Sequence, residues 1–471
     1  MTTSVATPQQ QQRRSRRGRR QARESLYVLT DRWSPLRYHA EQARLWNSRA
    51  RFRVVHAGRR SGKTELAKRY LVKCALACER PHGWFVYAAP TFAQAKQIYW
   101  HDAKALVPRR LMAGKPNESE LTIRLRNGAD ITVLGLDRPE RLEGRDLDGI
   151  DIDEYGNMKK SVWHEHVRPA LSTPGRPGWA WLFGVPEGRN HYYDLAEYAK
   201  GPDPEWDCFW WHSADILDAK EMEAVRREMD ERTLRQEYGG EFVDFAGRAY
   251  YPFTRELHAT ENLSGYYDPR DDLILCFDFN VSPGVAAVCQ ERFYTGDNPD
   301  VEKSKPITMV IGEVWIERGS NTPMVCRRLV EDWKEHKGRV LCYGDATGGA
   351  KGTAKVQGSD IDLIPAELRP HFQPGPVYMR FPKANPAVRS RINAVNTRLL
   401  TADGKVKLLV DPAKAPHVVK DLEGVTVKEG SAGELDKDGS LELTHISDGL
   451  GYYLAKDFPV RTPGVVQVTS L

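Results

Sequence analysis

The sequence predicts an α/β protein with two successive domains, each built on its own β-sheet. Three observations support this prediction. A glycine-rich loop pattern follows an apolar strand near residue 57 and opens a helical pattern. Strands and helices then alternate to about residue 240, which is typical of a mostly parallel sheet covered on both faces. A buried strand pattern near residue 275 starts the alternation again, and 471 residues are too many for one ordinary hydrophobic core.

The loop at residues 57–64 reads Ala-Gly-Arg-Arg-Ser-Gly-Lys-Thr, which is the pattern of a phosphate-binding loop. Small residues let backbone N–H groups point at a phosphate from the start of a helix. These small residues are Gly58, Ser61 and Gly62. Lys63 is expected to reach the β- and γ-phosphates, and the Thr64 hydroxyl to ligate Mg²⁺. Ala57 stands where this pattern usually begins with glycine. The alternative interpretation is a chance glycine-rich turn.

An apolar strand over residues 149–154 ends in two adjacent carboxylates and would complete the nucleotide site. We expect Asp153 to hold the Mg²⁺ through water and Glu154 to act as general base on the attacking water. The alternation places Asp151 on the same face as Asp153, so Asp151 is expected where the strand meets solvent. A surface strand with ordinary solvated acids is the alternative.

Four arginines are candidates for stabilising charge during phosphoryl transfer. Arg59 and Arg60 lie inside the loop and could act as an arginine finger in cis. Arg141 and Arg145 precede the acidic strand and could serve a neighbouring subunit's site in trans. Solvated surface arginines are an equally weighted alternative.

The remaining elements of the first half follow in order along the chain. Expected strands cover residues 52–56, 84–89, 121–126, 130–136 and 179–185, and those around Asn127-Gly128 form a hairpin. Expected helices cover residues 64–78, 92–106, 159–171, 191–200 and 219–238. Gly239-Gly240 and Gly247 interrupt this pattern of strands and helices. We expect a disordered basic arm over 1–24, a P-loop domain with a lid or linker at its end over 25–245, a linker over 246–265, a second α/β domain over 266–458 and a flexible tail over 459–471.

Charge is concentrated at the N-terminus. Seven arginines and one glutamate give residues 1–24 a charge of +6, whereas the whole chain carries +5, so the remainder is close to neutral. Such an arm either binds nucleic-acid phosphates or is an unstructured solubilising end. No apolar region follows it as in a secretion signal, although a mitochondrial transit peptide is also arginine-rich. No apolar run approaches the roughly 20 residues that span a bilayer.

The seven cysteines are scattered, and several lie in apolar patterns, which indicates buried thiols in a reducing compartment. Cys74 and Cys78 lie one helical turn apart, but no histidine or cysteine follows at the spacing of a zinc site. A metal role for these two residues is therefore not expected.

Three carboxylates of the second half are candidates for a metal site. Asp278 follows the strand 273–277, Asp345 follows the strand 339–343, and Asp448 opens a helical pattern over 447–456. If they converge, they could hold two Mg²⁺ or Mn²⁺ ions, which prefer oxygen ligands and promote phosphodiester cleavage. Each acid alone could equally be an ordinary strand-end or helix-capping residue. His445 could assist in acid–base chemistry or be structural. Residues 425–443 predict a long hairpin, either gating this site or lying on the surface.

These motifs together resemble the large terminase subunit of tailed bacteriophages, an ATP-driven DNA-packaging motor and nuclease. The residues that carry the resemblance are 38–42, 58–64, 144–149, 153–154, 183–191, 235–238 and the three aspartates.

The resemblance implies an N-terminal ASCE-type ATPase and a C-terminal RNase H-like nuclease. Gln42 would read the adenine, and Gly184-Val185-Pro186 would be the motif coupling hydrolysis to DNA movement, with Val185 where many members have threonine. Asp278, Asp345 and Asp448 would be the metal ligands. The implied cofactors are ATP with Mg²⁺ and two Mg²⁺ or Mn²⁺ ions in the nuclease site.

The resemblance also implies partners and a place of action. The partners would be double-stranded DNA, a small terminase subunit and the portal protein of the procapsid, and the tail could dock on the portal. The chain would form a ring, commonly a pentamer, when docked and would often be monomeric alone. It would act in the host bacterial cytoplasm and transiently on the portal, with no membrane partner. The alternatives are a DNA-dependent ATPase or helicase-like remodeller with a silent RNase H-like module, and a non-enzymatic assembly scaffold.

Overall fold

The computed structural model describes residues 39–188, 190–243, 247–278, 283–346, 360–428, 434–436 and 443–460, in which the chain forms two compact units. Unit 1 comprises the chain up to Pro186 together with His191–Leu217 and Tyr238–Glu241. Unit 2 comprises Glu187–Asn190, Asp218–Glu237 and Phe242–Leu471. The predicted basic arm and most of the predicted tail lie outside the described residues. Within the described ranges, no helix is long and apolar enough to cross a membrane.

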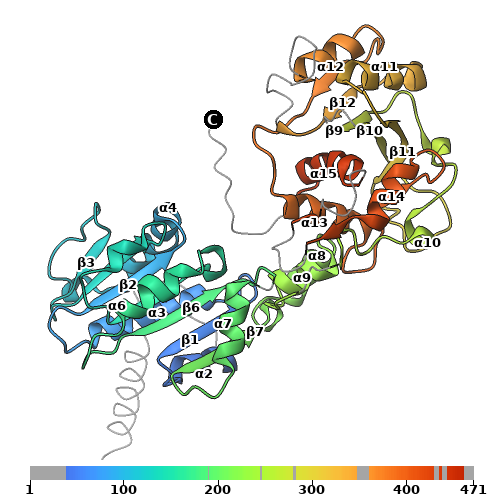
Figure 1. Ribbon diagram of the computed structural model, residues 1–471. Coiled ribbons are helices and arrows are strands. Elements are labelled where there is room, and N and C mark those ends of the chain that lie inside the picture. The colour runs from blue at the N-terminus through green and yellow to red at the C-terminus, as the bar shows by residue number, and fades with distance from the viewer. Residues whose placement is uncertain are drawn as a thin grey trace, which may run out of the picture. The chain divides into compact units, whose positions relative to one another are not determined.

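Unit 1 is built on a seven-stranded sheet with the order β3-β4-β2-β5-β6-β1-β7 (Figure 1). The strands are β1 (Phe52–Ala57), β2 (Trp84–Ala89), β3 (Thr122–Arg124), β4 (Asp130–Gly135), β5 (Gly149–Ile152), β6 (Trp179–Gly184) and β7 (Trp206–Trp211). Only the β3–β4 hairpin is antiparallel among these pairs. Every residue of β1, β2 and β5 is buried, as expected when helices cover both faces of a parallel sheet. Strand β6 separates β1, which carries the phosphate loop, from the acidic strand β5.

The helices of unit 1 confirm the predicted alternation. They are α2 (Ala40–Asn47), α3 (Lys63–Leu76), α4 (Phe92–Ala95), α5 (His101–Leu106), α6 (Arg168–Ala170) and α7 (His191–Ala199). Helices α4 and α5 are joined through a π-helical turn at Lys96–Trp100, so the predicted helix over 92–106 is continuous but irregular. A second π-helical segment, Val162–Val167, leads into α6. Sequence reasoning missed β7, because its run of aromatic residues has no clean alternation.

Unit 2 is built on a six-stranded sheet with the order β13-β12-β9-β10-β11-β14 (Figure 1). The strands are β9 (Leu273–Asp278), β10 (Gly284–Arg292), β11 (Ile307–Ile316), β12 (Val340–Tyr343), β13 (Val377–Met379) and β14 (Leu408–Val410). Strand β10 runs antiparallel to both neighbours, whereas β9 and β12 are parallel. The carboxyl ends of β9 and β12 therefore lie side by side. A separate pair joins β8 (Gly247–Arg248) to β15 (Thr426–Val427).

The helices of unit 2 are α8 (Ala219–Arg226), α9 (Glu231–Glu237), α10 (Arg255–His258), α11 (Thr322–Trp333), α12 (Asp360–Leu368), α13 (Val388–Leu399), α14 (Pro416–Gly424) and α15 (His445–Asp457). Helices α13, α14 and α15 cover one face of the sheet, and α11 and α12 cover the other. Alternate residues of β9 belong to two cores: Ile274 and Cys276 pack with residues of α13 and α15, and Leu275 packs with residues of α11 and α12.

One prediction about elements needs correction, and another is only partly covered by the described residues. The single helix expected over 219–238 is wrong, because the chain breaks into α8 and α9 around Met229. The long hairpin expected over 425–443 lies only partly in the described residues, where Val427 bridges Leu435 in antiparallel register.

Candidate functional site

The phosphate loop is held in shape by side chains from other elements. Strand β1 ends at Ala57 and α3 begins at Lys63, with Gly62 in the left-handed region at φ 81°. The Gln42 amide nitrogen donates to the Ser61 carbonyl at 2.8 Å. The indole nitrogen of Trp211 donates to the same carbonyl at 3.1 Å. This carbonyl therefore accepts two hydrogen bonds from side chains of other elements, which support the curvature of the loop.

Gly58 lies where no side chain fits. A Cβ atom there would lie 2.2 Å from Ser213 Oγ and 2.2 Å from the Tyr238 carbonyl oxygen. The Ser213 hydroxyl also donates to the Arg59 carbonyl at 2.6 Å. Ser213 and Trp211 are loop-supporting residues that sequence reasoning missed, because no motif marks them: Trp211 ends the unpredicted strand β7, and Ser213 follows it.

Lys63, Thr64 and Asp153 converge at the start of α3. Lys63 is buried, with Nζ 3.4 Å from the Gly58 carbonyl oxygen. Thr64 Oγ1 donates to Asp153 Oδ2 at 2.9 Å, although 89 residues separate them in sequence. A hydroxyl and a carboxylate at this spacing offer the oxygen ligands that Mg²⁺ prefers. The residues present therefore fit a Mg²⁺–nucleotide group.

Glu154 follows directly and adopts a left-handed backbone conformation at φ 53°. Its N–H donates to Asp153 Oδ1 at 3.0 Å. A Cβ at Gly184 would lie 3.3 Å from the Glu154 Cα, so the end of β6 packs against this residue. Burial and the Glu154 charge raise the pKa of Asp153, and the Lys63 ammonium opposes that shift. A strained backbone at a charged residue beside such a cluster is typical of a functional site.

The expectation that Asp151 meets solvent is wrong. Its side chain is fully buried, and neither carboxylate oxygen has a hydrogen-bond partner among the described residues. Burial, with a further contribution from the Asp153 charge, raises the pKa of Asp151 well above its ordinary value. Burial therefore favours the neutral form of Asp151, and every residue of the strand is buried, as is normal for a parallel strand covered on both faces.

The candidate arginines have different surroundings. Arg59 is half-buried and Arg60 is exposed, with a left-handed backbone at φ 59°. Arg145 pairs with Asp130 at 2.9 Å, and its guanidinium lies over the Trp84 ring. Arg141 lines a cavity of about 630 Å³ together with Arg145. The choice of arginine finger stays a prediction.

In unit 2 the three predicted aspartates lie at the ends of two neighbouring strands and on a helix that packs against one of them. Asp278 ends β9, and Asp345 follows β12, the parallel neighbour of β9. Asp448 lies in the first turn of α15, whose Gly449 packs directly on the end of β9: a Cβ there would lie 2.9 Å from the Cys276 carbonyl oxygen. Asp448, Asp345 and Asp278 each contribute to raising the pKa of Tyr452, to about 12, for which burial is the largest cause.

Asp448 is not a helix cap, because α15 already begins at His445 and the Asp448 side chain accepts from Arg391 Nη1 at 2.8 Å. His445 Nδ1 lies 3.1 Å from Asp278 Oδ2. Sequence reasoning missed Arg391, and also Asp421, which accepts from the Ser447 N–H at 3.1 Å. Burial raises the pKa of Asp421 to about 6.

The donor set of this site suits hard cations. Carboxylate oxygens bind Mg²⁺ and Mn²⁺ well, whereas a zinc site would need histidine or cysteine ligands. Across the residues described, no three histidine, cysteine or acidic side chains are grouped closely enough to hold a metal as they stand. Residues 279–282, which follow Asp278, and residues 347–359, which begin two positions after Asp345, lie outside the described residues.

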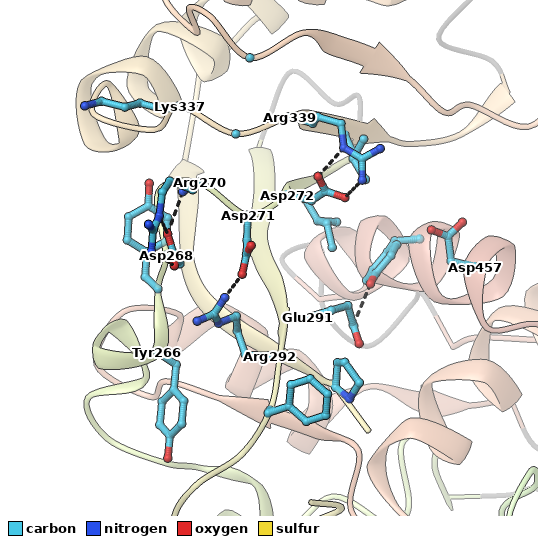
Figure 2. Close-up of a pocket in the computed structure, with 18 of the residues that line it drawn as sticks. Tyr266, Asp268, Arg270, Asp271, Asp272, Glu291, Arg292, Lys337, Arg339 and Asp457 are labelled. Atoms are coloured by element: carbon cyan, nitrogen blue, oxygen red, sulfur yellow. Dashed lines mark hydrogen bonds and ion pairs between the residues drawn. The ribbon is translucent and has the colours of Figure 1, made fainter. Parts of the chain in front are cut away.

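A larger cavity of about 1090 Å³ lies at the opposite ends of these strands, where β9 and β12 begin. Figure 2 shows its arginines turned toward carboxylates. Arg339 binds Asp272 through two hydrogen bonds of 2.6 Å, and Arg270 binds Asp268. Arg292 pairs with Asp271. Its charges are thus internally balanced, and the cavity is distinct from the aspartate site.

Fold and site together define the class of protein: a P-loop ASCE fold in unit 1 followed by an RNase H-like α/β fold in unit 2. Comparison with known proteins supports this class. No family model matches the sequence. The large terminase subunit of Thermus virus P23-45 is 28% identical over 247 residues, and that of Thermus phage G20c is 26% identical over 246 residues. Each match covers 45% of this chain. The chain spans about half the length of these relatives.

Solved structures extend the similarity in fold. The large terminase of a thermophilic bacteriophage is 15% identical, with a TM-score of 0.58 over 90% of this chain and 99% of the other. A further structure of that same terminase, in complex with ADP, has a TM-score of 0.57 over 89% of this chain and 99% of the other, again at 15% identity. The resemblance to large terminase subunits is therefore confirmed, in sequence over part of the chain and in fold over most of it.

Proposed function

We propose that the chain is the ATP-driven subunit of a viral DNA-packaging motor, and that it also cuts the DNA. Unit 1 would hydrolyse ATP and couple hydrolysis to translocation of double-stranded DNA into a procapsid. Unit 2 would cut the concatemer by two-metal endonuclease chemistry. The observation that carries this proposal is the convergence of Lys63, Thr64 and Asp153 in one unit, with three strand-end and helix aspartates in the other.

In unit 1, Lys63 would bind the β- and γ-phosphates, and Thr64 with Asp153 would hold Mg²⁺. Glu154 would orient and deprotonate the attacking water. Gln42 would read the adenine, and its contact with the Ser61 carbonyl ties that residue to the phosphate loop. Arg59 or Arg60 in cis, or an arginine of a neighbouring subunit, would stabilise the charge on the transferred group.

In unit 2, Asp278, Asp345 and Asp448 would hold two Mg²⁺ or Mn²⁺ ions, which supply an activated water and stabilise the leaving oxygen. The proposed partners are double-stranded DNA, a small terminase subunit and the portal protein, with a pentameric ring on the portal. The proposed place of action is the host bacterial cytoplasm, and transiently the procapsid portal.

A DNA-dependent ATPase or helicase-like remodeller with a silent RNase H-like module is the second candidate. It shares the whole nucleotide site and differs only in the aspartate site. An assay of DNA cutting therefore separates the two functions, whereas an assay of ATP turnover does not.

The test is to incubate purified protein and supercoiled plasmid with Mn²⁺ or Mg²⁺, comparing wild type with Asp278→Ala and Asp448→Ala. Asp297→Ala is the matched control, since that aspartate is exposed in the same unit. We expect metal-dependent cutting that is lost in the first two variants and kept in the control. Cutting that persists in both would show that the metal site lies elsewhere. A wild type that never cuts favours the remodeller.

A further inference from the structure

Arg391 is a buried cation placed against one of the three aspartates. Its side chain, on α13, is 8% exposed, and that of Asp448, on α15, is 11% exposed. Nη1 donates to Asp448 Oδ1 at 2.8 Å. Taking two charges out of water is costly, so a pair like this persists only where the surroundings hold it in good geometry.

The surroundings of Arg391 are shaped for it. A Cβ on Gly451 would lie 3.2 Å from the Arg391 Cβ, so the glycine makes room for the arginine stem. The guanidinium carbon lies 4.4 Å from the centre of the Tyr452 ring. Nε is buried without a hydrogen-bond partner among the described residues. Among the described residues, the Arg391 guanidinium therefore contacts the Asp448 carboxylate and the face of the Tyr452 ring.

The position of this charge matters because Asp448 is one of the three candidate metal ligands. Tyr452, which lies beside Arg391, also lies in the field of Asp278, Asp345 and Asp448. A guanidinium and a divalent cation would each stabilise the Asp448 carboxylate. When two positive groups stabilise the same carboxylates, each weakens the binding of the other, because linkage between binding events is reciprocal.

We propose that Arg391 is a positioning residue that acts as an internal counter-ion of the aspartate site. It holds Asp448 in the metal-free protein and competes with divalent metal for that carboxylate, which sets the metal concentration at which the site fills. The inference rests on the proposed function, in which the three aspartates hold the metal. It differs from the usual outer-shell partner, which raises ligand basicity and strengthens metal binding.

The test measures Mn²⁺ binding to the full chain without DNA at pH 8, by electron paramagnetic resonance. It compares wild type with Arg391→Gln, Arg391→Met and Arg391→Lys. We expect the two neutral variants to bind Mn²⁺ about tenfold more tightly, since a competing charge is gone, and Arg391→Lys to stay near wild type. The melting temperature should fall in the neutral variants without metal and rise more on adding Mn²⁺ than in wild type.

Equal or weaker Mn²⁺ binding in a folded neutral variant would overturn the inference. If Arg391→Gln does not fold, Arg391→Met decides by the same criterion, because apolar replacement of a buried ion pair is often tolerated. Asp345→Ala separates this failure from that of the proposed function. If wild type and Asp345→Ala bind Mn²⁺ equally, the aspartates are not the metal site, whatever the Arg391 variants do.

Discussion

The two carboxylate sites of the molecule use the same part of the fold but obtain their positive charge differently. Asp153 in unit 1 and Asp278 in unit 2 both lie at the carboxyl end of a buried strand, where α/β sheets bind ligands. In unit 1 the opposing cation is Lys63, which belongs to the phosphate loop itself. In unit 2 the opposing cation is Arg391, which pairs with Asp448 and belongs to a helix that no sequence motif marks.

This difference separates a site that is assembled locally from one that tertiary packing assembles. The residues of the phosphate loop are contiguous, so their backbone geometry carries most of the site. The aspartates come from two strands and a distant helix, and their counter-ion from another helix. We expect unit 1 to depend on loop geometry and unit 2 on charge balance.

The largest predicted effect tests whether the two sites are chemically independent. Glu154→Ala should lower ATP turnover by about 10³-fold, the scale of a lost general base, while metal-dependent plasmid cutting continues. Asp345→Ala should abolish cutting and leave basal ATP turnover within about twofold, because it lies in the other unit. Phosphate release and gel assays on the same preparations measure both. Loss of both activities in either folded variant would contradict the two-site division.

The next effect tests the dependence of unit 1 on loop geometry. Gly58→Ala forces a Cβ to within 2.2 Å of Ser213 Oγ and the Tyr238 carbonyl, so the loop must shift. We expect ATP affinity to fall at least about tenfold, since phosphate binding depends on fixed N–H directions. Gly114→Ala is the matched control, because nothing lies within 4 Å of a Cβ there. Binding of a fluorescent ATP analogue measures both variants. Equal affinity would show that the loop tolerates displacement.

Much of unit 1 could be predicted from the sequence because its signals are local. The strand–loop–helix pattern around Lys63 predicted β1 and α3, and Asn127-Gly128 predicted the β3–β4 hairpin. Trp211 supports the phosphate loop from β7, but its strand has no alternation, and no local rule links it to a loop 150 residues earlier.

The aspartates of unit 2 were predicted as candidates because each follows or opens a recognisable element. What the sequence did not reveal is their counter-charge. Arg391 lies in an amphipathic helix with several arginines, and only the packing of α13 on α15 distinguishes it. Asp151 shows the opposite failure: alternation predicted a solvent contact, but helix cover on both faces of the sheet buries the residue.

A third prediction concerns pH and the buried acid of unit 1. Asp151 has a pKa well above the ordinary 3.8, so the folded protein keeps a proton that the unfolded chain releases above that pH. Stability should therefore fall as pH rises from about 4, by up to about 1.4 kcal/mol per pH unit. Asp151→Asn removes this loss, so its melting temperature should exceed that of wild type at pH 8 and approach it at pH 4. Asp194→Asn, with a 64% exposed side chain, is the control. A gain that does not depend on pH would contradict protonation of Asp151.

The smallest expected effect tests which ends of the strands in the unit 2 sheet carry the DNA-cutting chemistry. Arg339 directly precedes β12, at the end of the strand opposite to Asp345, and its pair with Asp272 is half-exposed (Figure 2). Exposed ion pairs contribute little to stability, so Arg339→Met should lower the melting temperature by less than about 3 °C. Plasmid cutting and Mn²⁺ affinity should be unchanged, because the aspartates lie one strand length away. Unchanged cutting in Arg339→Met, together with loss of cutting in Asp345→Ala, would assign the chemistry to the carboxyl ends of the strands alone. A clear loss in Arg339→Met would instead make the large cavity part of the path that the DNA follows.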